Sequence, residues 1–220
     1  MIVLGIDTAT RFASVAILDG DRVLAEARSD ETGRRTDLLV LVDRACTAAK
    51  LTPRELAAVA IGAGPGSFTS LRIGMATAKG IAFAAHAPLW AISSLAALAA
   101  QAPAIGDDRV AAVLDARRGE VYVAAFDANG LVGEPRVLPP DQLDSLGATR
   151  FVGDAGAAYP QLLALPGIWD RTPLGADVAR LALAGPRADV LVTGVPAYIR
   201  PAEAEILYPD GVPGARRKRP

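Results

Sequence analysis

The pattern of apolar and polar residues in the first half of the chain predicts alternating strands and helices. Apolar runs that end in turn residues predict a meander of three strands, over 2–7, 13–18 and 23–28. Apolar residues at helical spacing predict two helices, over 36–50 and 69–84. Two shorter apolar runs predict further strands, over 56–61 and 89–92. We therefore expect a meander that is followed by alternating helices and strands.

The second half of the chain repeats this pattern. Its apolar runs predict strands over 110–115, 120–126, 131–137 and 151–152, and its periodicity predicts a helix over 176–184. An aspartate ends the first strand of each half, Asp7 in one and Asp115 in the other. The sequence thus predicts a duplicated β-β-β-α-β-α unit, which is an α/β fold of two small lobes with mixed sheets. A cleft is expected where the two hairpins face each other.

The repeat divides the chain into two lobes and a tail. We expect an N-terminal lobe over 1–105, a C-terminal lobe over 106–203 and a flexible tail over 204–220. Residues 196–200 are predicted to be extended. A basic cluster at 215–220 could contact a phosphate backbone, but at a chain end we interpret it as a solvated terminus.

A glycine-rich turn joins the strand over 56–61 to the second helix. Gly62, Gly64 and Gly66 lie at alternate positions in this turn. Glycine adopts a positive φ at little cost and lets another backbone come close, so we assign these three residues a structural role in the turn.

The second helix carries a face of small residues. Ser70, Gly74, Ala78 and Ala82 recur at a spacing of four, which places them on one side of the helix. A glycine inside a helix costs about 1 kcal/mol relative to alanine. We therefore expect a neighbouring helix to pack closely against this face.

Composition and charge indicate the cellular compartment of the protein and limit the kinds of partner that it is expected to bind. The 220 residues include 23 basic and 24 acidic side chains, for a net charge of −1, so no overall field draws the protein to nucleic acid or to a membrane. The single cysteine, Cys46, cannot form an internal disulfide, and residues 1–6 lack the features of a secretory signal. Polar residues and prolines interrupt the uncharged stretch over 80–106. We expect a cytoplasmic protein that makes no membrane contact.

Several catalytic sites do not fit the sequence. One histidine, His86, is too few for a paired-histidine metal centre. A serine hydrolase does not fit because Ser67 lacks the following glycine of a GxSxG motif and only His86 could serve as its base, and no GxGxxG motif is present. A stand-alone ATPase or kinase could use Asp7 and Asp115, but Ala9 restricts the close approach of a phosphate in the first turn. In the alternative interpretation, each aspartate caps its turn. We expect no catalytic residue, cofactor or metal.

Three strings and a closing motif resemble one protein family. They are GIDTAT at 5–10, GPGSFTSLRIGMATAKGIA at 64–82, LDARRGEVYVAAF at 114–126 and PAYIR at 196–200. The duplicated unit resembles the actin, sugar kinase and Hsp70 ATPase superfamily, with its ribonuclease H-like lobes, and the strings resemble the bacterial TsaB (YeaZ) family. This resemblance implies a non-catalytic subunit of the complex that places threonylcarbamoyl on the adenosine next to the tRNA anticodon, in tRNAs that read codons beginning with A.

The resemblance also implies partners and an interface. Family members pair with the paralogous transferase TsaD, help to recruit the ATPase TsaE, meet tRNA through the complex and form homodimers when isolated. Their interface consists of the first two helices, which implies that the contact residues here are Leu38, Val42, Cys46, Ser70, Gly74, Ala78 and Ala82. The chain departs from the family at Arg34, Arg35, Thr36 and Asp37, and at Ser70, where the family usually has glycine.

Overall fold

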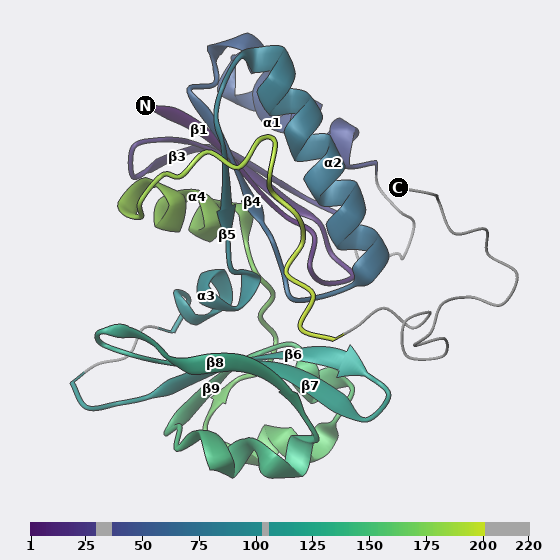
Figure 1. Ribbon diagram of the computed structural model, residues 1–220, viewed down its shortest axis with the longest axis vertical. Coiled ribbons are helices and arrows are strands. Elements are labelled where there is room, and N and C mark those ends of the chain that lie inside the picture. Colours follow the sequence, from purple (N-terminus) through teal and green to yellow (C-terminus); the bar gives the residue numbers. More distant parts are fainter. Residues whose placement is uncertain (30–36, 103–105, 201–220) are drawn as a thin grey trace, which may run out of the picture.

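The computed structural model describes residues 1–29, 37–102 and 106–200 of the chain. The first five strands form one mixed sheet in the order β3-β2-β1-β4-β5 (Figure 1). The first three strands are antiparallel, and β4 and β5 run parallel to β1. All lie within two residues of the predicted strands: β1 (Ile2–Asp7), β2 (Ser14–Asp19), β3 (Arg22–Arg28), β4 (Ala58–Gly62) and β5 (Leu89–Ile92).

A second mixed sheet repeats this topology. Its order, β8-β7-β6-β9-β10, has the same sequence of antiparallel and parallel neighbours as the first sheet. The strands are β6 (Val110–Arg117), β7 (Glu120–Asp127), β8 (Gly130–Leu138), β9 (Arg150–Gly153) and β10 (Gly167–Ile168). Asp7 in β1 and Asp115 in β6 occupy equivalent strands, so the predicted duplication is confirmed.

Helices cover both faces of the first sheet. On one face, α1 (Leu38–Ala49) and α2 (Phe68–Ala85) share a hydrophobic core with Leu4 of β1. On the opposite face, α4 (Gly175–Ala184) shares a second core with Val3 (Figure 1). Successive side chains of a strand point to opposite faces, which explains why neighbouring residues of β1 enter different cores. The first lobe is therefore a three-layer α/β unit.

After the second lobe, the C-terminal part of the described chain packs against the first lobe again. α4 packs on β1 and β2, and beyond it the Val190 amide donates a hydrogen bond to the Leu89 carbonyl of β5. The predicted C-terminal lobe over 106–203 is therefore wrong in its second boundary. The contact is possible because Gly5 and Gly175 lie backbone to backbone, where a Cβ on either glycine would overlap the other residue's carbonyl oxygen.

A short helix joins the two lobes. α3 (Ser94–Ala99) begins after Ser93, whose hydroxyl accepts a hydrogen bond from the Ala96 amide. The helix lies between the two sheets (Figure 1), and it packs with second-lobe strands and with Ala9 and Leu71 of the first lobe. The two lobes thus share one hydrophobic core.

The second lobe has less helix than the first. At the place of α1 it has a 3-10 helix over Pro140–Leu146, which begins after Pro139 and ends at Gly147 in the left-handed conformation. Residues 196–200, predicted as extended, form no strand. Within the described ranges, no helix combines the length and the apolar content that a bilayer crossing requires.

Candidate functional site

The glycine turn between β4 and α2 has the structural role that the sequence predicts. Gly64 has a φ of +106°, a conformation that favours glycine. A Cβ at Gly62 would overlap the Asp7 carboxylate, and a Cβ at Gly66 would overlap the Ala9 carbonyl. One glycine therefore supplies the backbone conformation, and the other two allow β1 and its turn to come close.

Asp7 lies at the centre of a buried hydrogen-bond network. Its Oδ1 accepts from the Ala9 amide at 2.8 Å, and its Oδ2 accepts from Ser94 Oγ at 2.6 Å. Ser94 Oγ in turn accepts from the Gly64 amide at 3.2 Å. The side chain is almost completely buried, and this burial raises the pKa of Asp7 to about 6 against the hydrogen bonds that lower it. Asp7 therefore caps its turn, and its carboxylate does not face an open cleft.

Asp115 caps the equivalent turn in the second lobe. Its Oδ1 accepts from the Arg117 amide at 2.7 Å. The Tyr159 hydroxyl lies 3.2 Å from the same oxygen and 3.1 Å from the Glu120 carbonyl oxygen, so it can share its proton between them. The capping interpretation of both aspartates is confirmed.

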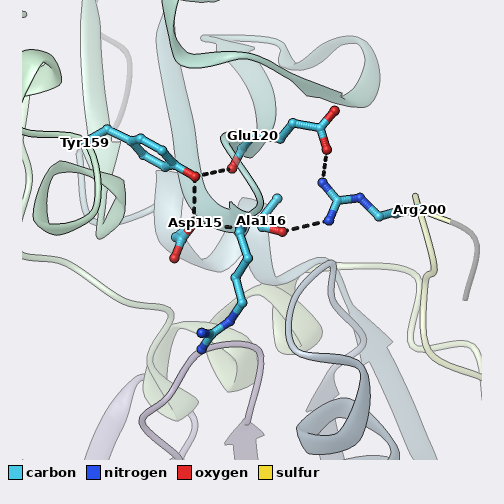
Figure 2. Close-up of polar contacts among 6 residues, drawn as sticks. Asp115, Ala116, Glu120, Tyr159 and Arg200 are labelled. Carbon is cyan, nitrogen blue, oxygen red and sulfur yellow. Dashed lines mark hydrogen bonds and ion pairs between the residues drawn. The ribbon is translucent and has the colours of Figure 1, made fainter. Parts of the chain in front are cut away.

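Arg200 lies in the C-terminal segment, which hydrogen-bonds to the first lobe through Ala197 and Ala63. It connects this segment to the β6–β7 hairpin of the second lobe. Its guanidinium donates to the Ala116 carbonyl at 2.8 Å and pairs with the Glu120 carboxylate (Figure 2). At the tip of this hairpin, Arg117 and Arg118 have φ values of 60° and 58°. Such a conformation is strained for residues with a side chain and persists where neighbours hold it. Tyr159 and Arg200 bond to residues 115, 116 and 120, on either side of this tip.

We expect Arg200→Ala to lower the free energy of unfolding by about 1–2 kcal/mol, because it removes two charge-assisted hydrogen bonds at a half-exposed site. Hydrogen exchange in residues 115–121 should become faster. Urea unfolding and exchange mass spectrometry measure the two effects. Arg136→Ala, at an exposed position of β8, is the control, and equal behaviour of the two variants would contradict the assignment.

A second carboxyl near the junction has a perturbed pKa. Asp154 accepts a hydrogen bond from the Asp115 amide at 3.1 Å. Burial raises the pKa of Asp154 to about 6, and the Arg11 guanidinium of the first lobe opposes this shift. The lobes therefore interact electrostatically through Arg11 and Asp154.

His86 and Cys46 both have structural positions. His86 ends α2 in the left-handed conformation, and its amide donates to the Phe83 carbonyl at 3.2 Å. Cys46 is buried on the inner side of α1, where burial and the nearby Asp43 raise the pKa of its thiol. Within residues 1–29, 37–102 and 106–200, no three histidine, cysteine or acidic residues are grouped so that they could hold a metal ion.

The structure corrects the orientation of the two helices expected at the interface. Six of the seven expected contact residues are buried inside the first lobe, and Ser70 is half-buried; the six are Leu38, Val42, Cys46, Gly74, Ala78 and Ala82. Gly74 is small because a Cβ there would overlap Thr8 Oγ1, which donates a hydrogen bond to the Ser70 carbonyl at 2.9 Å. The close approach on this face therefore comes from β1's turn and not from another helix.

The outward surface of these helices consists of other residues. On α2, Ile73, Ala76, Gly80 and Phe83 are exposed and follow one another at helical spacing. On α1, which contacts α2, Leu39 and Val40 are also exposed and apolar. We call these six residues the α1–α2 outer surface. Sequence reasoning missed them, although the positions 73, 76, 80 and 83 carry a detectable helical pattern.

The departures from the family pattern have different outcomes. Ser70 lies within α2 and has no positive φ, so serine in place of glycine causes no backbone strain here. Its hydroxyl donates to Ser67 Oγ at 3.0 Å. Asp37 caps α1 by accepting from the Leu39 amide at 3.0 Å. Arg34, Arg35 and Thr36 lie outside the described residues.

Comparison with known proteins places the chain in a family. Residues 33–166 match the family model described as TsaD, tRNA N6-adenosine threonylcarbamoyltransferase. The Escherichia coli tRNA threonylcarbamoyladenosine biosynthesis protein TsaB is 34% identical over 173 residues, which cover 74% of this chain and 75% of that protein. The structure of YeaZ from Pseudomonas aeruginosa has 29% identity and a TM-score of 0.73, with 90% of this chain and 99% of that chain covered.

A more distant neighbour supports the fold class. An inorganic polyphosphate/ATP-glucomannokinase from Arthrobacter aligns with a TM-score of 0.50 at 13% identity, over 84% of this chain and 99% of that chain. At that identity the likeness concerns the fold alone. The expected duplicated fold of the actin and sugar kinase class is confirmed. The chain therefore belongs to the TsaB (YeaZ) family and carries the TsaD-type domain.

Proposed function

We propose that this protein takes part in the formation of threonylcarbamoyladenosine in tRNA, as a non-catalytic subunit. In this proposal it pairs with a TsaD-like paralogue through the α1–α2 outer surface, helps to recruit a TsaE-like ATPase and meets tRNA through the complex. Family membership supports the pathway. The observation that carries the pairing is the exposed apolar surface of the two helices.

The α1–α2 outer surface has the composition of a helix-packing interface. The side chains of Leu39 and Phe83 are 56% and 73% exposed, which leaves large apolar groups in water. Between Ile73 and Phe83, the exposed residues Ala76 and Gly80 are small. A Cβ at Gly80 would meet nothing within 4 Å, so no contact inside the monomer explains this glycine. Close approach by a helix of another chain would explain it.

We expect Gly80→Arg to weaken binding to the TsaD-like partner at least tenfold. Arginine favours the helix, and its Cβ would meet nothing within 4 Å, so the variant should be at least as stable as the parent protein. A long cation in the middle of a closely packed interface, however, would prevent contact. Titration calorimetry with the purified partner measures the affinity, and thermal unfolding measures the stability.

The matched control is Leu131→Arg, which puts the same cation on an exposed apolar position of β8 in the second lobe. This variant should bind the partner like the parent protein. Unchanged affinity of the Gly80→Arg variant would show that the α1–α2 outer surface is not the interface with the partner. Phe83→Glu is an independent variant on the same surface, and it should also weaken binding.

The same surface accounts for homodimers of the isolated chain. Exposed apolar helices that meet a paralogue can also meet a second copy, because paralogues share the fold. Sedimentation of the isolated protein would then show a dimer that dissociates in the Gly80→Arg variant. A dimer that persists in this variant would place self-association elsewhere.

The alternative of a stand-alone ATPase or kinase has less support from the site. Asp7 is enclosed by Ala9, Ser94 and Gly64, so its carboxylate is not directed at a bound nucleotide. ATP turnover by the isolated chain would favour the alternative. Depletion of the protein in cells, followed by measurement of threonylcarbamoyladenosine in bulk tRNA, tests the pathway directly: an unchanged level would contradict our proposal.

A further inference from the structure

A small cavity lies between the end of α4 and β5, the last strand of the first sheet. Its volume is about 80 Å³, and its lining includes Trp90 and Ile92 of β5, Ala182 of α4, and Pro186 and Arg187 of the loop that follows α4. An engineered cavity of about 150 Å³ holds benzene, so this one has room for about four non-hydrogen atoms. It lies on the α4 side of the sheet, opposite α1 and α2.

Trp90 brings a buried hydrogen-bond donor to this cavity. The residue is 5% exposed and belongs to the core beneath α4. Its indole Nε1–H is buried, and among the described residues it has no hydrogen-bond acceptor. A buried donor without an acceptor costs free energy, and native structures usually satisfy such a group. The Trp90 N–H is therefore available to an acceptor that enters beside it.

Arg187 brings a positive charge to the same cavity. Its guanidinium lies 5.9 Å from the centroid of the Trp90 ring, and its Nε and Nη2 donate to the Leu183 carbonyl at 3.1 and 2.7 Å. In the part of the chain that the structure describes, Arg187 forms no ion pair with a carboxylate. The nearby Asp189 accepts from the Leu89 amide at 3.0 Å instead. The guanidinium thus keeps further N–H donors for a ligand.

The backbone of Arg187 suggests how a ligand enters. Arg187 has a φ of 53°, a left-handed conformation that is strained for arginine and persists where neighbouring contacts hold it. Its hydrogen bonds to the Leu183 carbonyl are exposed to solvent. A charged acceptor can replace them, because charge-assisted hydrogen bonds are stronger than bonds to a carbonyl. Movement of Arg187 off the Trp90 ring then opens the way to the indole N–H.

We propose that this cavity binds a short aliphatic carboxylate, of the size of acetate or propionate. One carboxylate oxygen accepts from Trp90 Nε1–H, the other pairs with Arg187, and the alkyl group contacts the apolar walls at Ile92 and Ala182. The two polar side chains are donors only, whereas a carboxylate is an acceptor only and has two oxygens. An amine would be repelled by Arg187, and a phosphate has no apolar part for the walls.

The two indole signals of the NMR spectrum test the site directly. The chain contains two tryptophans, Trp90 and Trp169, and Trp90→Phe assigns the signals. We expect sodium acetate to move the Trp90 signal downfield with saturation in the roughly millimolar range, because so small a ligand binds weakly. Trp169 is the internal control, since its Nε1–H already donates to the Leu165 carbonyl at 3.2 Å. Sodium chloride at equal concentration controls for ionic strength.

Two comparisons test the role of the charge. Arg187→Gln should weaken acetate binding at least fivefold, whereas Arg136→Gln, at an exposed position of β8, should leave it unchanged. Acetamide has the shape of acetate without its charge, and it should bind the parent protein at least fivefold more weakly. Because Arg187 is exposed, the remaining signals of the Arg187→Gln variant should be those of the folded protein.

Saturable movement of the Trp90 signal alone, weakened by Arg187→Gln, supports the proposal. A Trp90 signal that stays in place at acetate concentrations far above the millimolar range would overturn it, because an ordered water would then be a sufficient acceptor. Equal movement of both indole signals, or equal binding of acetate and acetamide, would also overturn it.

Discussion

Replacing Gly74 with leucine should lower the free energy of unfolding by about 3 kcal/mol or more, whereas the same change at Gly80 should not. Both glycines lie in the middle of α2. A Cβ at Gly74 would overlap Thr8 Oγ1 and come within 3.2 Å of the Thr8 Cβ, in a buried position. The leucine must displace Thr8 and its hydrogen bond to Ser70, and overpacking of this kind typically costs 1–3 kcal/mol before that loss.

Gly80→Leu is the matched control, because a Cβ there meets nothing within 4 Å and leucine favours the helix. For a chain of this size, 3 kcal/mol corresponds to a fall in Tm of roughly 6–12 °C, which differential scanning calorimetry resolves. Wild-type melting of Gly74→Leu would show that Gly74 does not face the interior of the lobe. Loss of partner binding in this variant would follow from unfolding and would not identify an interface residue.

Asp7→Asn should change the pH dependence of stability by about 3 kcal/mol. The pKa of Asp7 is about 6 in the folded protein and near 3.8 in the unfolded chain, so the folded state binds the proton more tightly. The stabilisation from this protonation is complete below pH 3.8 and is lost as the pH rises through 6. About two pKa units correspond to about 3 kcal/mol.

The measurement is urea unfolding of both proteins between pH 4 and pH 7.5. The asparagine side chain does not titrate, so the variant should gain stability relative to the parent protein as the pH rises across this window. Asp154→Asn should show a second change of the same sign, because the pKa of Asp154 is also raised to about 6. Asp144→Asn, at an exposed position, is the control. A difference that does not vary with pH would contradict the burial of a protonated Asp7.

The duplicated fold was predictable because its evidence lies in local patterns. Each half of the chain places turn residues between short apolar runs and an aspartate at the end of its first strand. These features depend only on residues that are close together in the sequence, so they can be recognised without the structure. Asp7 and Asp115 could therefore be matched before either sheet was known, and their capping role followed from the same turns.

The orientation of α2 was not predictable in this way. A glycine in a helix indicates that another group packs closely against it, but it does not identify that group. At Gly74 the neighbour is Thr8, 66 positions earlier in the chain, and at Gly80 no neighbour exists within the monomer. The low helix propensity of glycine suggests close packing at both positions, and three-dimensional packing separates them. The return of α4 to the first sheet was missed for the same reason, since Gly5 and Gly175 are distant in sequence.

The route of the chain has a consequence for its synthesis. The first lobe contains residues from both ends of the described chain, because α4 and the segment through Tyr198 pack against it. During synthesis on the ribosome, α4 can cover the core around Val3 only after the whole second lobe has emerged. Until then one face of the nascent sheet remains exposed, so the second lobe is free to fold before the first is complete.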